Sequence, residues 1–313
     1  MSIKKGIILA GGNGSRLMPL TKSISKQLLP VYDKPMIYYP LATLMSLGIR
    51  DILIISTRRD LPRFKELLNN GSNIGLSISY EFQNKPNGIA EAFIIGKNFI
   101  GSDSVCLILG DNIFHGKNID KLLAKAIKNL DNKFSSIVSV NSNNPKDFGV
   151  IEFNSSKKIQ RIIEKPKKTK SKSIVSGIYF FTNDVIKVAS ALKPSQRGEL
   201  EIIDVVNYFL EKDKLKVINL NNNFFWSDTG TYDSLIETSN YFNDIEKNTH
   251  KKVACVEEIA LLKKFISLKE FAKIKDSMSS SNYGKYLSNI INENINWNIL
   301  EQNSLAYMLL IIK

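Results

Sequence analysis

The fold is decided by the stretch GIILAGGNGSRLMPLT, residues 6–21, which is followed by SKQ at residues 25–27. Its first five residues form a short Ile-rich apolar run, which predicts a buried strand of a parallel sheet. Glycine then lets backbone N–H groups face a ligand without a Cβ in the way, and three occur within four residues: Gly11, Gly12 and Gly14. Arg16 and Lys26 follow, and the first 31 residues contain no acidic side chain. The stretch therefore predicts a loop that binds a polyphosphate.

Two commoner glycine loops fit this stretch less well. A dinucleotide-binding loop needs a third glycine where this chain has Leu17, and Pro19 would interrupt the helix that must follow. A Walker loop needs Gly-Lys-Ser/Thr, but here Arg16 follows Ser15. A tight surface turn with two solvated cations is an alternative that this stretch alone leaves open.

The wider region resembles the signature of the sugar-nucleotide pyrophosphorylases, a family of sugar nucleotidyltransferases. The likeness includes SKQLLPVYDKPMIYYP at residues 25–40 and runs from about Lys5 to about Leu287. Within the family it is greatest to the enzymes that use dTTP and glucose 1-phosphate. The resemblance implies transfer of a nucleotidyl group to give dTDP-glucose and pyrophosphate, the first step of dTDP-rhamnose and deoxysugar synthesis for cell-surface polysaccharides. It also implies Mg²⁺ as cofactor and a homotetramer.

Composition agrees with a globular enzyme. The 313 residues are 43% hydrophobic and 23% charged, so the chain can bury a large core. The net charge of +13 raises the question of nucleic-acid binding, but its only dense run, residues 164–172, is typical of a solvated loop between strands. Two cysteines, Cys106 and Cys255, fit a reducing cytosol, and we expect a cytoplasmic protein that binds neither nucleic acid nor membrane. The apolar run Leu305–Ile312 is too short to cross a bilayer.

The hydrophobic pattern predicts an α/β fold: a Rossmann-like, mostly parallel mixed sheet flanked by helices, an inserted antiparallel sugar-binding lid, and a C-terminal helical region. We expect strands at residues 51–56, 76–82, 105–109, 136–140, 149–153, 159–164 and 175–181, and helices at 36–47, 64–68, 88–98, 234–246 and 257–265. The predicted domains are residues 1–231 for nucleotidyl transfer (nucleotide-binding core 1–133, sugar-phosphate part 134–231), an oligomeric or regulatory region 232–291, and a divergent tail 292–313.

Two aspartates follow predicted strands and could share a magnesium ion. Asp111 comes directly after the strand ending at Leu109, and Asp228 comes after the aromatic run Phe225–Trp226. Mg²⁺ binds one or two carboxylates together with phosphate oxygens and water. Each aspartate could instead be the cap of a following turn or helix. In the family, the matching residues hold the ion together.

Sugar-phosphate recognition is expected among the strands of residues 135–181. Phe148-Gly149 offers an aromatic edge and bare backbone to a sugar, although the family has a tyrosine where this chain has Phe148. Glu164 can accept from sugar hydroxyls while Lys165 holds a phosphate; a surface ion pair is the alternative. Arg197 matches a residue that contacts the sugar phosphate.

Base recognition is expected at the end of the strand that closes with Phe82. The carboxamide of Gln83 offers a donor and an acceptor that complement the O4 and N3–H edge of thymine or uracil. In the family, residues matching Gln83 and the Gly88 backbone read that edge. The thymine methyl is worth only about 1–3 kcal/mol in a pocket, so strict choice between thymine and uracil does not follow.

The resemblance implies three groups of site residues, apart from the metal ligands Asp111 and Asp228. Arg16, Lys26 and Lys165 would be catalytic. The nucleotide would bind at Leu9, Gly11, Gly12, Gly14, Ser15, Arg16, Gln27, Gln83, Pro86 and Gly88. The sugar phosphate would bind at Leu109, Asn112, Gly149, Glu164, Lys165, Val175, Tyr179 and Arg197.

A second nucleotide site for end-product feedback is implied near Lys252–Ile259. Two residues there depart from the family pattern, with Val256 in place of a proline and Leu262 in place of an arginine. Three alternatives to the thymidylyl reaction stay open: uridylyl or adenylyl transfer to a hexose 1-phosphate, a non-catalytic nucleotide-sensing paralogue, and a basic nucleic-acid-binding protein.

Overall fold

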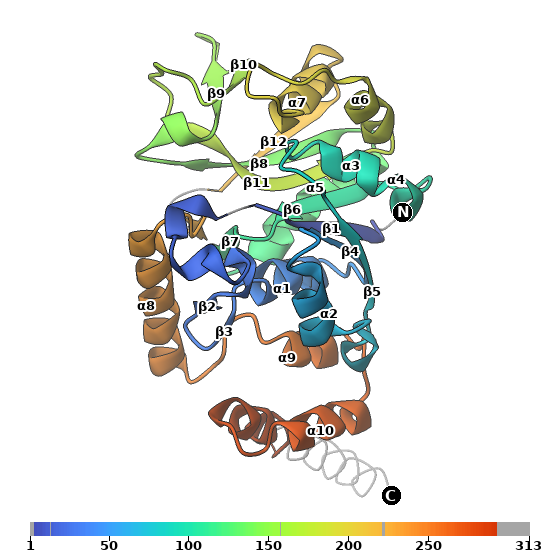
Figure 1. Ribbon diagram of the computed structural model, residues 1–313, viewed down its shortest axis with the longest axis vertical. Coiled ribbons are helices and arrows are strands. Elements are labelled where there is room, and N and C mark those ends of the chain that lie inside the picture. Colours follow the sequence, from blue (N-terminus) through green and yellow to red (C-terminus); the bar gives the residue numbers. More distant parts are fainter. Residues whose placement is uncertain (1–2, 13, 157, 221–222, 293–313) are drawn as a thin grey trace, which may run out of the picture.

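The computed structural model describes residues 3–12, 14–156, 158–220 and 223–292. Asn13 of the glycine loop, most of the predicted tail 292–313 and its apolar run Leu305–Ile312 lie outside this range. In the described part, one nine-stranded sheet runs in the order β10-β9-β11-β6-β1-β4-β5, and β8 pairs with both β11 and β12. Figure 1 shows β9 and β10 at one end of the long axis and α10 at the other.

Four parallel strands form the half of the sheet that carries the glycine loop: β1 (Lys5–Ala10), β4 (Asp51–Ser56), β5 (Ser77–Phe82) and β6 (Val105–Leu109). Their register pairs Leu9 with both Ile55 and Leu109, so the carboxyl ends of the strands are level. The segments that follow these strands therefore emerge at one edge of the sheet, where ligands of open α/β sheets bind.

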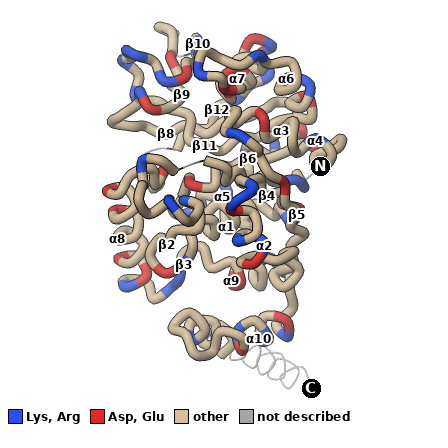
Figure 2. Tube along the Cα trace, viewed as in Figure 1, with Lys and Arg blue, Asp and Glu red and all other residues tan. Residues whose placement is uncertain are grey.

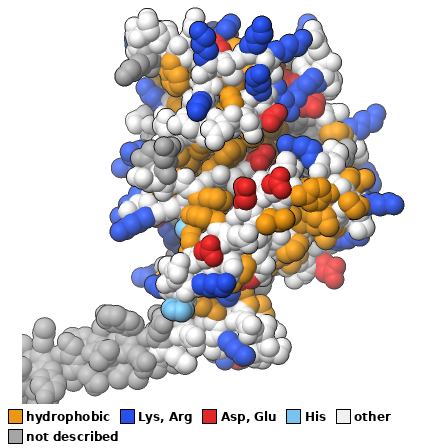
Figure 3. Space-filling view, turned by 90° about the vertical axis from the view of Figure 1, so that its left-hand side faces the viewer, with side chains coloured by type: hydrophobic (Ala, Val, Ile, Leu, Met, Phe, Trp, Pro, Cys, Tyr) orange, Lys and Arg blue, Asp and Glu red, His pale blue; other side chains and the backbone are white. Residues whose placement is uncertain are grey.

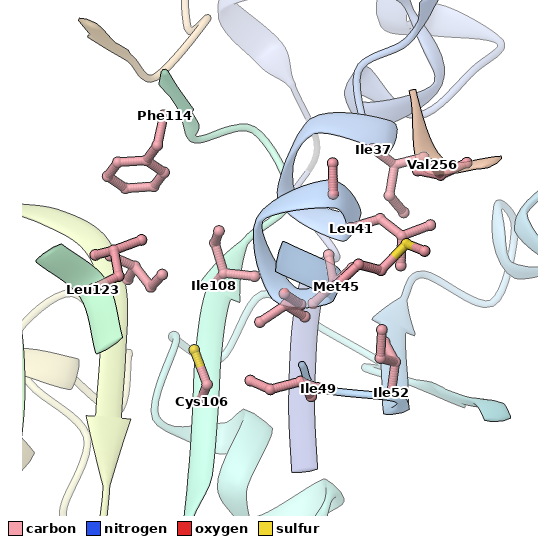
Figure 4. Packing of buried hydrophobic residues seen from close by; sticks show 14 of the residues in the cluster. Ile37, Leu41, Met45, Ile49, Ile52, Cys106, Ile108, Phe114, Leu123 and Val256 are labelled. Carbon is pink, nitrogen blue, oxygen red and sulfur yellow. The ribbon is translucent and has the colours of Figure 1, made fainter. Parts of the chain in front are cut away.

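Helices cover both faces of the sheet, which explains why its central strands are continuous apolar runs. Ile8 and Ala10 face one cluster with α1 (Tyr38–Ser46), α2 (Leu61–Leu68) and α5 (Ile119–Asp131). Ile7 and Leu9 face a second cluster with α3 (Glu91–Ile95), α6 (Val185–Ala191) and α7 (Ile202–Glu211). In Figure 4, the side chains of the α1 segment point at β4 and β6 from directly above them.

The predicted helix over residues 88–98 is shorter and divided in two. α3 begins at Glu91, and α4 (Lys97–Ile100) follows after Gly96. The preceding residues are fixed instead by Leu200, whose N–H donates to Asn87 O and whose carbonyl accepts from Ala90 N–H. Gly88 has φ +104°, and a Cβ there would lie 2.3 Å from Leu200 O, so a helical start at residue 88 is excluded.

The strands expected as a lid pair antiparallel with one another, but all four join the main sheet and do not form a separate layer. β11 (Ser173–Phe181) pairs with β6, and β8 (Ser135–Asn141) pairs with β11. β9 (Gly149–Phe153) and β10 (Ile159–Glu164) continue the sheet beyond β11, and β12 (Leu215–Asn219) lies parallel to β8. The fold class is confirmed, and the inserted part extends the nucleotide-binding sheet.

A small two-stranded ribbon connects the end of β6 with a segment more than 100 residues later. β7 (Ile113–His115) pairs antiparallel with β13 (Phe225–Ser227), with Ile113 opposite Ser227. Asp111 lies just before β7 and Asp228 just after β13, so this pairing brings the two aspartates to the same place.

The C-terminal region is helical, as expected. α8 (Tyr232–Thr249), α9 (Val256–Leu262) and α10 (Leu268–Ser277) are followed by helical residues at 282–292. Cys255 and Val256 are buried in the cluster formed with α1, and Figure 4 shows Val256 beside Ile37. Both cysteines are free and buried. None of the helices in the described ranges combines the length and apolarity needed to cross a membrane.

Candidate active site

A buried lysine joins the two aspartates. Lys26, only 6% exposed, donates from Nζ to Asp111 Oδ2 at 2.8 Å and to the backbone carbonyl of Asp228 at 2.9 Å. It lies in a short 3₁₀ turn, η3 (Lys26–Leu28), directly after the glycine loop. The segment between that loop and Pro30 therefore supplies the cation, while the acids follow β6, the neighbour of β1, and β13 of the small ribbon.

The loop after β13 is shaped to hold Asp228 beside Asp111. Thr229 is fully buried in a left-handed conformation (φ 41°), and its hydroxyl donates to Asp111 O at 2.8 Å. The N-cap of α8 is Thr231, whose side chain accepts from Ser234 N–H, so Asp228 is not the cap of that helix. Asp111 precedes a strand, so it is not a helix cap either. Capping of a helix therefore accounts for neither carboxylate.

Both carboxylates retain exposed oxygen atoms. Asp111 Oδ1 accepts from Asn112 Nδ2 at 2.9 Å, and Asp228 Oδ1 accepts from Gly230 N–H at 3.2 Å. Their side chains are 26% and 23% exposed. No cluster of three or more His, Cys, Asp or Glu suited to a metal occurs within the described ranges. Two carboxylates with free lone pairs, beside a phosphate site, are nevertheless the donor set that Mg²⁺ accepts when phosphate and water complete its shell.

Arg16 lies at the mouth of the site. Its guanidinium is 61% exposed and its Nη2 is 3.8 Å from Asp228 Oδ2, too far for a hydrogen bond. A Cβ on Gly230 would come within 2.7 Å of Arg16 Nη2, so glycine makes room for this side chain. Gly14 is left-handed (φ +58°) and its carbonyl accepts from the Thr21 hydroxyl, which fixes the loop before Arg16. The loop thus fixes the backbone before Arg16, while the largely exposed guanidinium forms a long ion pair with Asp228.

Seven of the predicted nucleotide residues line one cleft of about 190 Å³ at the carboxyl edge of the sheet, whereas Gly14, Ser15 and Arg16 lie outside its lining. Its walls are Leu9, Gly11, Gly12, Gln27, Gln83, Pro86, Gly88, Ile89, Leu109, Asp111 and Glu199. A Cβ on Gly110 would lie 2.9 Å from Gln27 Cγ, and one on Gly11 would lie 2.9 Å from Gln83 Oε1. Bare backbone therefore allows the two glutamines to close over the loop. Ile89 and Glu199 were missed, although each is next to a predicted segment.

The opposite side of the site is rich in charge. Arg197 donates to Glu201 Oε2 at 2.7 Å and lies 3.4 Å from both Glu164 Oε1 and Glu199 Oε2. Burial raises the pKa of Glu164, and the positive charges of Lys165 and Arg197 offset this only in part. Lys165 is exposed, and its backbone (φ 41°) is held by a hydrogen bond from its N–H to Phe148 O. The structure thus groups the predicted Glu164, Lys165 and Arg197 in one place.

Tyr179 connects this charged group to the aspartates. It is buried on β11, and burial raises its pKa, with the negative charges of Glu164 and Asp111 adding to the increase. Val175 lies on the same strand, which bulges between the two residues, where Gly177 adopts φ +79°. The sugar-side prediction therefore extends continuously from Glu164 to Asp111.

Trp226 and Phe148 form an aromatic pair between the segment of Asp111 and Asn112 and the segment of Glu164. Trp226 Nε1 donates to Asn112 Oδ1 at 3.0 Å and to Ser176 O at 2.9 Å, and its ring contacts Phe148 edge-on at 5.4 Å. A Cβ on Gly149 would lie 3.5 Å from Glu164 Oε2. Sequence reasoning missed Trp226, Thr229 and Glu201 as supporting residues. The sequence did offer a signal for them, because Trp226 and Thr229 lie close to Asp228, and Glu201 lies close to Arg197.

Charge over the molecule is mixed. Lysines and arginines alternate with acidic residues throughout the described trace in Figure 2. Figure 3, which views the side where α8 lies, shows acidic side chains beside apolar ones across the middle of the face, with many cations toward its margins. This face carries no continuous basic stripe of the kind that binds a nucleic-acid backbone.

Comparison with known proteins agrees with this geometry. A family model described as nucleotidyl transferase matches residues 5–245. The glucose-1-phosphate thymidylyltransferase of Neisseria meningitidis serogroup A is 46% identical over 287 residues, covering 92% of this chain and 99% of the relative. That of Mycobacterium tuberculosis is 44% identical over 290 residues, covering 93% and 100%.

Solved structures show the same fold. A crystal structure from Bacillus anthracis, assigned as a glucose-1-phosphate thymidylyltransferase in complex with sucrose, has a TM-score of 0.69 at 38% identity, covering 76% of this chain and 94% of that one. A UDP-glucose pyrophosphorylase complexed with UDP-glucose has a TM-score of 0.68 at 24% identity, covering 78% and 99%, which shows a shared fold. By sequence and by fold, the chain belongs to the nucleotidyl transferase family.

Proposed function

We propose that this protein is a glucose-1-phosphate thymidylyltransferase, which converts glucose 1-phosphate and dTTP to dTDP-glucose and pyrophosphate. The substrate pair is supported by the names of the relatives, which match this chain over almost their whole length. One observation carries the reaction type: Lys26 joins the Asp111 carboxylate to the Asp228 backbone beside a glycine loop, with the exposed guanidinium of Arg16 3.8 Å from the Asp228 carboxylate. Such a site neutralises a polyphosphate.

The reaction needs no covalent enzyme intermediate, because the sugar phosphate is already an anionic nucleophile. One of its oxygens attacks the α-phosphorus of dTTP and forms the new O–P bond, while the bond to the bridging oxygen opposite breaks and releases pyrophosphate. We assign Arg16 and the amides of the glycine loop to the departing pyrophosphate, and Lys26 to the charge around the α-phosphate. Catalysis is then mainly positioning and charge neutralisation.

The nucleophile would be held on the other side by Lys165 and Arg197. Because Arg197 is engaged by Glu201 and lies near two further carboxylates, we expect part of its donor set to turn to the phosphate when the sugar binds. Glu164 would accept from sugar hydroxyls. Glu201 would then keep Arg197 oriented, which a freely mobile surface arginine could not achieve.

Members of this family generally use a divalent metal ion. We propose Mg²⁺, held by Asp111 and Asp228, since both carboxylates have exposed oxygens next to the phosphate site. The bound ion would add positive charge to the phosphates of the nucleotide. Lys26 would keep the Asp111 carboxylate and the backbone of Asp228 in place before and after the ion binds.

A second proposal concerns the region of residues 252–259. A cavity of about 200 Å³ lies there between α1, β7 and the segment before α9, lined among others by Ser46, His115, Asp120, Val253 and Ile259. We propose that it accepts an end-product nucleotide in a homotetramer. Support for assembly comes from Ile236, Tyr232 and Leu262, which are large, apolar and exposed. Val256 is buried and Leu262 is 70% exposed, so these two departures affect different environments.

The test of the main proposal is pyrophosphate release from a panel of nucleoside triphosphates (dTTP, UTP, ATP) with glucose 1-phosphate and other hexose 1-phosphates. We expect dTTP with glucose 1-phosphate to give the highest kcat/KM and to require Mg²⁺, with loss of activity on chelation. Preference for UTP or ATP would assign a uridylyl- or adenylyltransferase instead. Binding of nucleotides without turnover would assign a sensing paralogue, and a salt-dependent shift of random DNA would assign a nucleic-acid-binding protein.

A further inference from the structure

The amide group of Gln83 is held in one orientation by its neighbours. Its Nε2 donates to Gly88 O at 3.0 Å and to Glu91 Oε2 at 2.7 Å, which uses both of its hydrogens. A backbone carbonyl accepts hydrogen bonds and cannot donate, and a carboxylate likewise only accepts. The reversed amide would place its oxygen against these two acceptors, so the assignment of nitrogen and oxygen follows from the network.

The acceptor end of Gln83 faces the cleft. Its Oε1 lies against the bare backbone of Gly11 in the wall of the nucleotide cleft. Among the described residues, no hydrogen bond to this oxygen is formed. The side chain is only 6% exposed. Gln83 therefore presents a single acceptor to a ligand, and the donor expected from the sequence is used inside the protein.

Glu91 is itself fixed. Its other oxygen, Oε1, accepts from Asn87 Nδ2 at 2.9 Å, and the backbone of Asn87 and Ala90 is hydrogen-bonded to Leu200. Glu91 also begins α3, where a negative side chain is favoured by the helix N-terminus. The carboxylate is thus anchored from two directions and cannot follow a rotation of the Gln83 amide.

We propose that Glu91 is a positioning residue for base selection: by occupying the donor end of Gln83, it leaves only an acceptor for the base. This inference rests on the proposed function. An acceptor matches the N3–H of thymine or uracil, but faces the unprotonated N3 of cytosine, so the two acceptors repel. Cytosine is the informative competitor because it is a pyrimidine of the same size. Selection against it is then set by Glu91 through Gln83, and not by the width of the cleft.

The test uses Glu91→Met, which keeps the length of the side chain but removes its acceptors, and Glu91→Gln, whose Oε1 can still accept from Gln83. The readout is the ratio of kcat/KM for dTTP over dCTP, at saturating glucose 1-phosphate. We expect Glu91→Met to lower this ratio about tenfold, the effect of one freed hydrogen-bonding group. Glu91→Gln should keep the ratio within about threefold of the parent, as one acceptor remains.

A matched control separates positioning from a general loss of structure. Glu81→Met changes an exposed glutamate on β5, the strand that ends directly before Gln83, and should leave the ratio unchanged. A purely structural role of Glu91 would weaken both nucleotides alike and leave the ratio at the parental value, which would overturn the proposal. The ratio of the dissociation constants for dTTP and dCTP, from ligand-induced shifts in Tm, gives the same comparison without turnover. Failure of the parent enzyme to use dTTP would instead refute the proposed function.

Discussion

Lys26 and Lys34 lie eight residues apart and are both buried, yet their surroundings differ. Lys26 contacts Asp111 in a site that opens to solvent, next to the exposed Arg16. Lys34 lies between Asp33 and Glu246, and Lys252 contacts the same two carboxylates from the other side. The second group contains two cations and two anions in mutual contact.

This second, closed group (Asp33, Lys34, Glu246 and Lys252) also satisfies its remaining polar atoms internally. Glu246 Oε1 accepts from Val253 N–H at 3.1 Å, and Lys252 lies over the rings of Tyr283 and Tyr286. The closed group joins the loop after Lys26 to the end of α8 and to the C-terminal helices. The open group around Lys26 leaves the guanidinium of Arg16 and oxygens of Asp111 and Asp228 accessible to a ligand. A buried lysine in the signature stretch is therefore not by itself a catalytic residue; the availability of its neighbours decides.

Of the substitutions that test this comparison, we expect Lys34→Met to have the largest effect, a loss in the free energy of unfolding. Removing the cation leaves Glu246, which is 8% exposed, with one partner fewer, and breaking a buried pair costs about 3–5 kcal/mol. We expect a loss of that order in the free energy of unfolding, measured by urea denaturation. Lys5→Met, which removes a more exposed pair with Asp51, should cost less than about 1 kcal/mol. Equal losses in the two variants would show that the closed group has no special role.

Arg16→Ala tests the open group. The guanidinium is free to meet developing charge, so kcat should fall about 10²–10³-fold. The KM for the sugar phosphate should change far less, and the unfolding free energy should stay at the parental value. Arg161→Ala is the matched control, because that arginine is 63% exposed and paired with Glu152 away from the cleft. An unchanged kcat in Arg16→Ala would remove this residue from its proposed role.

Variants of Thr231 and Asp228 distinguish a capping residue from a proposed catalytic one within the same loop. Thr231→Ala should lower the free energy of unfolding by about 1 kcal/mol, because it removes the N-cap of α8. Asp228→Asn keeps the oxygen that accepts from Gly230 N–H, so stability should hold while kcat falls. Paired urea titrations and steady-state assays give both quantities. A stability loss confined to Asp228→Asn would favour the capping interpretation.

The smallest effect concerns the pH dependence of stability. Burial raises the pKa of Glu164 in the folded protein above its unfolded value, so the folded state holds a proton that the unfolded state has lost. The free energy of unfolding should therefore decrease as pH rises from the unfolded pKa through the folded pKa. Glu164→Gln should remove this component, seen in urea titrations as a shallower decrease as pH rises above the ordinary glutamate pKa of 4.5. Parallel curves for the two proteins would contradict the raised pKa.

Glu201 should show the opposite sign. Burial alone would raise its pKa, but hydrogen bonds from Arg197 and Ser195 outweigh this and hold the pKa below the ordinary value of a glutamate. Its contribution to stability is present above the unfolded pKa and is lost as pH falls through the folded one. Glu201→Gln is thus a useful internal comparison for Glu164→Gln.

Sequence reasoning located the central strands well, because strands buried on both faces are continuous apolar runs. The bounds of β4 and β6 are as predicted, and so are those of the partly exposed strands β9 and β10, which polar turns delimit. The helix predicted over residues 88–98 was wrong at its start, because the backbone of Asn87 and Ala90 bonds to Leu200. A contact at that separation leaves no trace in local hydrophobic periodicity, since tertiary pairing overrides propensity.

The same limit applies to the site. The residue types of Asp111, Asp228 and Lys26 indicated phosphate and metal chemistry, and the structure brings the three together. Local sequence could not distinguish Lys26 from Lys34, because Glu246 lies more than 200 residues away. It also assigned the Gln83 donor to the base, since the partner that uses it, Glu91, belongs to a different element.

Leu200 has a consequence for how the two substrates are received. Its backbone N–H and carbonyl hold the segment that we propose to frame the base, while its neighbours Glu199 and Glu201 contact Arg197, which we assign to the sugar phosphate. In the proposed reaction, one continuous segment of the chain would thus support the binding of both the nucleoside and the hexose. We expect occupancy at one end to alter affinity at the other, so that the pair is recognised jointly.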